Sequence, residues 1–182
     1  MRTPALTAVV AILALAACDR SQRAGRNEAA SPENVTNVGG NAATETMVDS
    51  AFVTEAMMGD NGEVAIGELA QTQGESQAVK DFGKLLVADH GAHKQELGAL
   101  AQAAGIKTTD DLSDDAKANL EKLEALRGHA FDREFKTMMV EDHTKDIGKY
   151  EKQASSGDAD TAALAQKTLP TLRKHLEAAK SL

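Results

Sequence analysis

The residues best able to do chemistry in this chain are one glutamate and three histidines, each on a different predicted helix. Imidazole nitrogens bind zinc, copper, nickel or iron well, and a nearby carboxylate completes the metal shell or orients a histidine from behind. One interpretation of the pattern is therefore a site for one divalent metal ion. Its candidate ligands are Glu63, His90, His143 and His175, and its supporting groups are Asp89, His93 and Asp142.

These groups stand out because they interrupt stripes of apolar residues with helical spacing. His90 follows Phe82 and Leu86, and His143 follows Phe135 and Met139, at steps of three or four residues. Such a stripe normally packs into a core, and a polar group there needs a partner once it is buried. Counted along the helix axes from the interhelical turns, Glu63 and His90 are offset by roughly 6–8 Å, and so are His143 and His175.

Three interpretations of these polar positions remain open at the level of sequence. The groups bind a metal ion, or they form a buried hydrogen-bond network that sets the register of the helices. In the third interpretation, the stripes are offset by one position and several of the groups face water.

The spacing argues against di-iron oxidase chemistry and offers no other catalytic motif. Di-iron carboxylate bundles carry Glu-x-x-His on two helices, but apolar residues stand three positions before the three candidate histidines. These residues are Val87, Val140 and Leu172. No nucleophile elbow is visible, so a binding or structural role is favoured over an enzyme.

The apolar spacing predicts helices and no sustained strand alternation. Ser76 is a predicted N-cap and Gly105 a predicted C-terminal cap. Gly59 and Gly62 weaken the first helix by up to about 1 kcal/mol each and allow a break there, and Pro170 should kink the last helix. The predicted helices span 48–72, 77–104, 113–127, 129–155 and 159–181. We expect an all-α, ferritin-like four-helix bundle with one crossover that carries the short extra helix.

Composition limits the function further. The chain has 182 residues, a net charge of −8 and one cysteine. The negative charge argues against nonspecific nucleic-acid binding, and the lone cysteine excludes an internal disulfide or a multi-cysteine metal site.

The first 17 residues are typical of a secretory signal. A positive start precedes the apolar run 5–17, which is too short to span a membrane. The run ends in Leu15-Ala16-Ala17-Cys18, which resembles the bacterial lipoprotein box with Cys18 as the lipidated residue. Asp19 favours retention at the inner membrane, although the outer membrane stays open. We therefore expect a signal peptide at 1–17, a lipidated cysteine and tether at 18–47, and a periplasm-facing bundle at 48–182.

Several motifs together resemble an exported bacterial ferritin-like family, catalogued as domain of unknown function 4142. The resemblance covers about residues 48–181 and implies a four-helix periplasmic domain with no established activity. Glu63, His90, His143 and His175 carry over by position, whereas His93 and the stretch 59–62 do not. The motifs are Phe52-Val53-Thr54-Glu55-Ala56, Leu86-Val87-Ala88-Asp89-His90, Phe131-Asp132-Arg133, Asp142-His143 and 168–175 (TLPTLRKH).

Two functions follow as expectations. The first is a membrane-anchored envelope module that binds a divalent metal ion or acts in stress. The second is an envelope interaction or structural protein in which the buried Glu and His groups only fix helix packing. The sequence names neither the metal nor a protein partner.

Overall fold

The computed structural model describes residues 47–182. The predicted signal peptide, Cys18 and almost all of the predicted tether lie outside this part of the chain. The described part is all-helical, without a strand, and none of its helices is both long and apolar enough to cross a membrane. The helices are α1 (Ser50–Gln73), α2 (Gln77–Ala104), α3 (Asp114–Glu124), α4 (Gly128–Ser156) and α5 (Ala159–Ser181).

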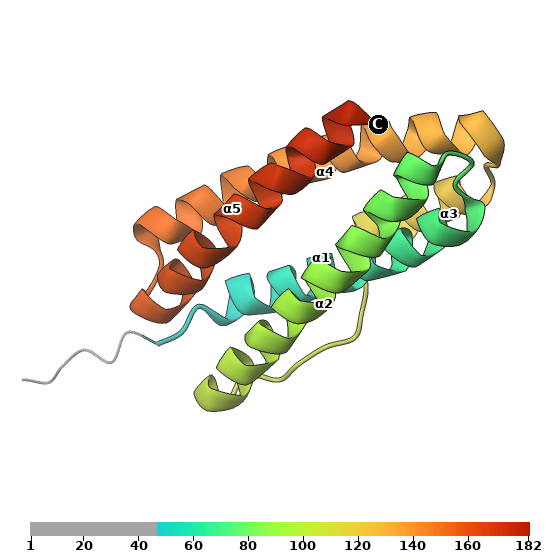
Figure 1. Ribbon diagram of the computed structural model, residues 1–182. Coiled ribbons are helices and arrows are strands. Elements are labelled where there is room, and N and C mark those ends of the chain that lie inside the picture. The colour runs from blue at the N-terminus through green and yellow to red at the C-terminus, as the bar shows by residue number, and fades with distance from the viewer. Residues whose placement is uncertain (1–46) are drawn as a thin grey trace, which may run out of the picture. The chain divides into compact units, whose positions relative to one another are not determined.

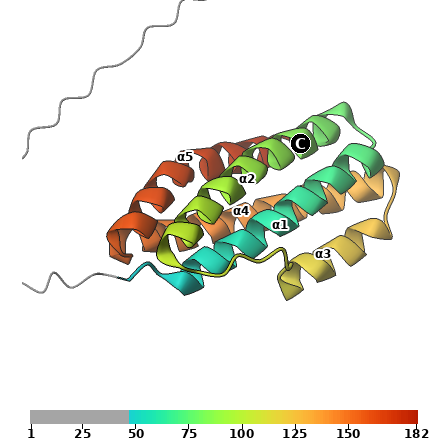
Figure 2. The ribbon, with the colours of Figure 1, turned by 90° about the horizontal axis from the view of Figure 1, so that it is seen from below.

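The four long helices form two hairpins that pack into a helical bundle. The helix α1 pairs with α2, and α4 pairs with α5. The short helix α3 packs against α1 and α4, after the connection from the end of α2 has run back along the bundle (Figures 1 and 2). The predicted order of helices is therefore confirmed, with bounds that differ by a few residues.

Capping residues set several of these bounds, the predicted caps Ser76 and Gly105 among them. The Ser76 hydroxyl accepts a hydrogen bond from the Val79 amide at 3.2 Å, and Gly105 ends α2 with a φ of 68°. A positive φ suits glycine because it has no Cβ. The Ser113 hydroxyl caps α3 through the Ala116 amide at 3.1 Å.

Two glycines that the sequence stripes did not single out bring α1 and α2 close together. A Cβ on Gly67 would lie 2.8 Å from the Gly83 carbonyl oxygen. A Cβ on Gly83 would lie 2.6 Å from the Gly67 carbonyl oxygen. Neither position has room for a side chain. The first hairpin therefore depends on a glycine on each helix at this crossing.

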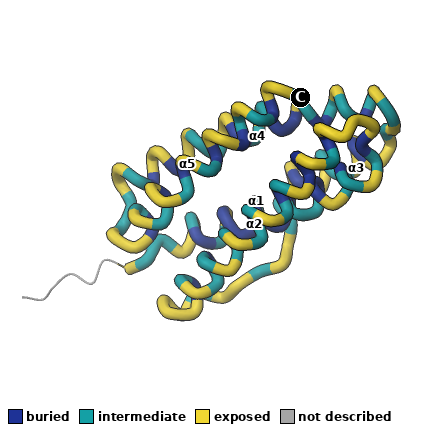
Figure 3. Tube along the Cα trace, in the orientation of Figure 1, coloured by how far each residue is buried: buried dark blue, intermediate teal, exposed yellow. Residues whose placement is uncertain are grey.

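The helices bury one face each, as Figure 3 shows by the dark segments turned toward the inside of the bundle. The helix α1 runs unbroken through Gly59 and Gly62, so the break that these glycines allow does not occur. In the first half of α5 the buried face is formed by Ala165 and Leu169, while Leu164 and Thr168 are half-buried.

Candidate metal centre

Three buried histidines from three helices meet inside the bundle. His90 of α2, His143 of α4 and His175 of α5 each place one ring nitrogen within 4.8 Å of the other two. Their exposed fractions are 6%, 1% and 0%, and Glu63 is 5% exposed. These four groups therefore do not face water, whereas Asp89 and Asp142 are only partly buried.

The histidines form a polar layer between two apolar clusters. One cluster contains Leu86 and Met139, and the other contains Leu97, Tyr150 and Leu172. Along each helix the histidine lies between members of the two clusters. The same stripes that build the core therefore carry the three rings inward.

Hydrogen bonding sets which nitrogen of His143 faces the cluster. Its Nδ1 lies 2.9 Å from the Met139 carbonyl oxygen, which can only accept, so Nδ1 carries the hydrogen. Burial, followed by the nearby His90 and His175, lowers the pKa of His143 to about 3. The ring is therefore neutral, and Nε2 presents a lone pair to its neighbours.

His175 presents its other nitrogen in the same way. Its Nε2 lies 2.8 Å from Asp89 Oδ2, so Nε2 donates to the carboxylate. Burial lowers the pKa of His175, although Asp89 works in the opposite direction. The lone pair on Nδ1 then lies 3.3 Å from His143 Nε2, and two lone pairs face each other unless a cation or a proton lies between them.

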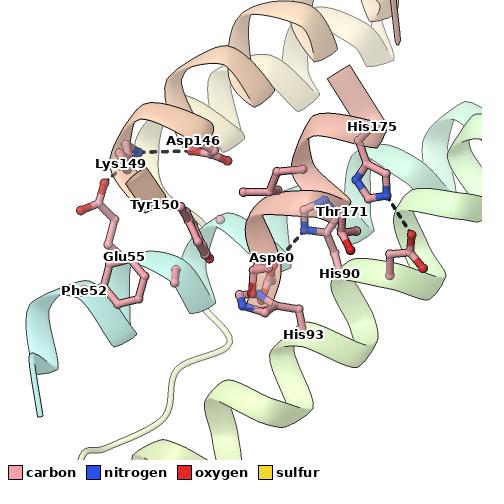
Figure 4. A pocket seen from close by; sticks show the side chains of 15 residues that line it. Phe52, Glu55, Asp60, His90, His93, Asp146, Lys149, Tyr150, Thr171 and His175 are labelled. Carbon is pink, nitrogen blue, oxygen red and sulfur yellow. Dashed lines mark hydrogen bonds and ion pairs between the residues drawn. The ribbon is translucent and has the colours of Figure 1, made fainter. Parts of the chain in front are cut away.

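A single carboxylate holds both histidines of α2. Asp60 of α1 lies 2.9 Å from His90 Nδ1 through Oδ1 and 2.8 Å from His93 Nδ1 through Oδ2. Figure 4 shows the two rings on either side of Asp60. His90 Nε2 and His93 Nε2 are both buried without a hydrogen-bond partner. His90 Nε2 is therefore the nitrogen left for the cluster.

Asp60 and His90 each favour the charged form of the other. Burial works to raise the pKa of Asp60, but the hydrogen bonds from His90 and His93 outweigh it and lower the pKa. Burial works to lower the pKa of His90, but the bond to Asp60 and the nearby Glu63 raise it. A proton on His90 therefore competes with any cation for the cluster.

Sequence reasoning missed Asp60. The sequence did offer a signal, because Val53, Met57 and Asp60 follow one another at helical steps. The structure buries all three residues. The other acceptor, the Met139 carbonyl, is backbone and has no sequence signal.

The supporting residues behave differently from one another. Asp89 orients His175 from behind, and His93 shares Asp60 with His90. The structure does not bring Glu63 or Asp142 into the group of converging ligand atoms. Both line a separate cavity of about 160 Å³ between α1, α3 and α4.

The carboxyl groups in this second cavity hold protons unusually tightly. Burial raises the pKa of Glu63 to about 8, and Glu63 Oε2 is buried without a hydrogen-bond partner. Burial also raises the pKa of Asp142 to about 6. The amide of Asn119 donates to Asp142 at 3.2 Å.

Another cavity, of about 70 Å³ and called the first cavity below, lies beside the histidine layer (Figure 4). His90, His93 and His175 line it, together with Tyr150 and Thr171. Its wall also contains four carboxylates and one lysine. These are Glu55, Asp60, Asp89, Asp146 and Lys149.

The described helices and this layer define the class of the domain, a helical bundle with a buried three-histidine cluster. A family model described as "Domain of unknown function (DUF4142)" matches residues 35–182. The chain belongs to this family, as the resemblance of its motifs predicted. No curated protein and no solved structure matches the chain.

Proposed function

We propose that this protein is an envelope-anchored domain that binds one divalent transition-metal ion through His90 Nε2, His143 Nε2 and His175 Nδ1. One observation carries the proposal. In each of the three histidines, one nitrogen is engaged by an oxygen acceptor and the other is turned toward a common centre. Metal-binding histidines characteristically have this arrangement, since the acceptor sets the tautomer and the orientation of the ring.

One pair of the three nitrogens already has the separation that a metal site requires, and the third nitrogen lies within 4.8 Å of both. Zinc–nitrogen bonds of about 2.0–2.1 Å at tetrahedral angles separate two ligand nitrogens by about 3.3 Å. His143 Nε2 and His175 Nδ1 are 3.3 Å apart. A buried acceptor without a partner costs about 1–3 kcal/mol, so a cation that binds the three lone pairs removes a considerable penalty.

The charges around the first cavity favour access by a cation. Asp60, Asp89 and Asp146 lie on its wall beside His90 and His175. Neutral imidazole is a good ligand for zinc, copper, nickel and iron alike. We therefore assign the class of metal and not one element.

The location belongs to the proposal as well. Its support is the sequence of residues 1–18, where an apolar run ends at the lone cysteine. We infer a ferritin-like topology from the two hairpins and the long connection between them, and a periplasm-facing domain that serves as a metal-binding or stress-related module. A Cys18→Ser variant should lose membrane fractionation. If it still pellets with membranes, the anchor is wrong.

A second function rests on the same 3.3 Å separation, because that distance is also within hydrogen-bond range. If His175 carried a hydrogen on Nδ1, it would donate to His143 and the layer would be a structural network. That form requires either a doubly protonated His175, which burial disfavours, or a neutral Asp89. The protein would then fix helix packing without a metal.

Metal content separates the two functions. Full-length protein made without a histidine tag is analysed for bound metal by mass spectrometry and titrated with Zn²⁺ in a calorimeter. We expect one ion per chain and a rise in thermal stability, which amounts to about 3 kcal/mol when free metal exceeds Kd a hundredfold. No stoichiometric metal, and no thermal shift with zinc, copper, nickel or iron, would overturn the proposal.

The decisive variant is His143→Asn. The asparagine amide can still donate to the Met139 carbonyl, but it offers no nitrogen lone pair to the centre. Metal binding should be lost while the metal-free fold remains. His90→Asn applies the same logic at Asp60. His129→Asn is the matched control, because His129 is 83% exposed and lies outside the cluster.

A further inference from the structure

The three-histidine cluster lacks a fourth protein ligand within the described residues. Among the described histidine, cysteine, aspartate and glutamate side chains, only His90, His143 and His175 form a group whose ligand atoms all lie within 4.8 Å of one another. Tetrahedral sites with three protein ligands keep the remaining position for an exogenous molecule. The direction of that position decides what the site can bind.

Three of the carboxylates beside the cluster already have partners. Asp60 accepts from two histidines, and Asp89 accepts from the outer nitrogen of His175. Asp146 lies 3.5 Å from Lys149 Nζ. Glu63 lies near His90 and its Oε2 has no partner. None of these carboxylates, Glu63 included, places an oxygen among the converging ligand atoms, so they leave the fourth position open.

The cavity of about 70 Å³ lies on the side of His90 and His175, and both rings line it. A cavity of this size has room for water molecules or a small ligand. The walls contributed by Phe52, Ala56 and Leu172 are apolar.

His93 adds a polar group to this space. Its side chain is 10% exposed, and its Nε2 is buried without a hydrogen-bond partner although the ring lines the cavity. Because Asp60 can only accept, His93 Nδ1 carries a hydrogen. With that one hydrogen on the ring, Nε2 is an acceptor and fits a donor such as water.

We propose that the metal ion keeps one exchangeable coordination position that opens into this cavity, where His93 Nε2 accepts a hydrogen bond from a metal-bound water. The inference rests on the proposed function and adds the ligand class, namely water and monodentate molecules of a few atoms. His93 is then a positioning residue for that ligand and not a metal ligand itself.

Cobalt and azide test the two levels separately. The full chain is loaded with Co²⁺, and its visible absorption is recorded as sodium azide is added. Cobalt uptake with a saturable, one-to-one spectral change is the expected result. Cobalt uptake with a spectrum that azide leaves unchanged would overturn the inference and leave the proposed function standing. No uptake of cobalt, zinc, copper, nickel or iron would overturn both.

Two variants examine the cavity and His93. In His93→Leu, bound water loses its acceptor, so azide should displace it more easily. One hydrogen bond corresponds to an affinity gain of about three- to tenfold. General damage to the site would weaken azide binding instead, and that result would overturn the role of His93.

Thr171→Phe places a ring at the cavity wall and should weaken azide binding while cobalt still binds. His129→Leu is the control and should match the parent protein.

Discussion

Replacing Glu63 by glutamine should reverse a pH-dependent loss of stability that the buried carboxyl group causes. Glu63 is almost fully buried, and no protein donor pairs its Oε2. Burial raises its pKa from 4.5 to about 8. Glutamine has nearly the same shape and carries no charge at any pH.

The sign follows from where the proton is held. Between pH 4.5 and about 8 the folded chain holds the Glu63 proton that the unfolded chain has released. The folded state therefore binds more protons in this range, and its stability falls as the pH rises. Between about pH 5 and about pH 9 the loss is at most about 4 kcal/mol. Local relaxation and water in the adjoining cavity reduce it.

The assay is urea unfolding of metal-free protein, followed by circular dichroism, at several pH values in the presence of a chelator. The quantity of interest is the unfolding free energy of Glu63→Gln minus that of the parent. Titrating groups far from Glu63 cancel in this difference. His90 and Asp142 interact with Glu63, so their shifts are part of the difference. This difference in unfolding free energy should grow between about pH 5 and about pH 9 by more than about 1 kcal/mol and by at most about 4 kcal/mol.

The matched control is Glu68→Gln, an exposed position on the same helix. Its difference from the parent should not change with pH. If the Glu63→Gln difference is also flat to within about 0.5 kcal/mol, Glu63 is not a buried acid with a raised pKa, and the reasoning fails.

Two further predictions concern packing and the metal. Gly62→Ala should destabilise the fold by about 1–3 kcal/mol, because the new Cβ would lie 2.7 Å from that of Ala116 on α3. Gly59→Ala meets nothing within 4 Å and should stabilise α1 by up to about 1 kcal/mol; equal effects in thermal unfolding would contradict this packing. Asp89→Asn should weaken zinc binding by about 10–100-fold, because the amide no longer holds the Nε2 hydrogen of His175 as a carboxylate does; unchanged affinity by calorimetry would remove Asp89 from the site.

Much of the fold follows from local physical chemistry. Caps such as Ser76 and Ser113 satisfy amide groups within three residues of themselves, and Gly105 supplies a left-handed backbone that other residues rarely adopt. These effects do not depend on the rest of the chain, so the element bounds could be read directly. The same holds for the burial of His90 and His143, because each lies on a stripe that needs a partner surface.

The grouping of the site residues followed from the tertiary structure. Periodicity places a residue on a face of its helix, but it leaves the rotation and axial shift of that helix to packing. Asp60 and Glu63 are one turn apart on α1, and the structure turns Asp60 toward α2 and Glu63 toward the cavity shared with α3 and α4. Glu63 therefore lies outside the histidine group, whereas Asp60, absent from the sequence prediction, supports it.

The sequence by itself determined that this chain forms long amphipathic helices, that polar groups interrupt their apolar stripes, and that its motifs belong to one family. The tertiary structure decided which of these groups meet. His90, His143 and His175 lie far apart in the chain, and only the packing of the two hairpins brings their nitrogens together. It also decided the tautomers, because the acceptors Asp60, Asp89 and the Met139 carbonyl determine which nitrogen of each ring keeps its lone pair.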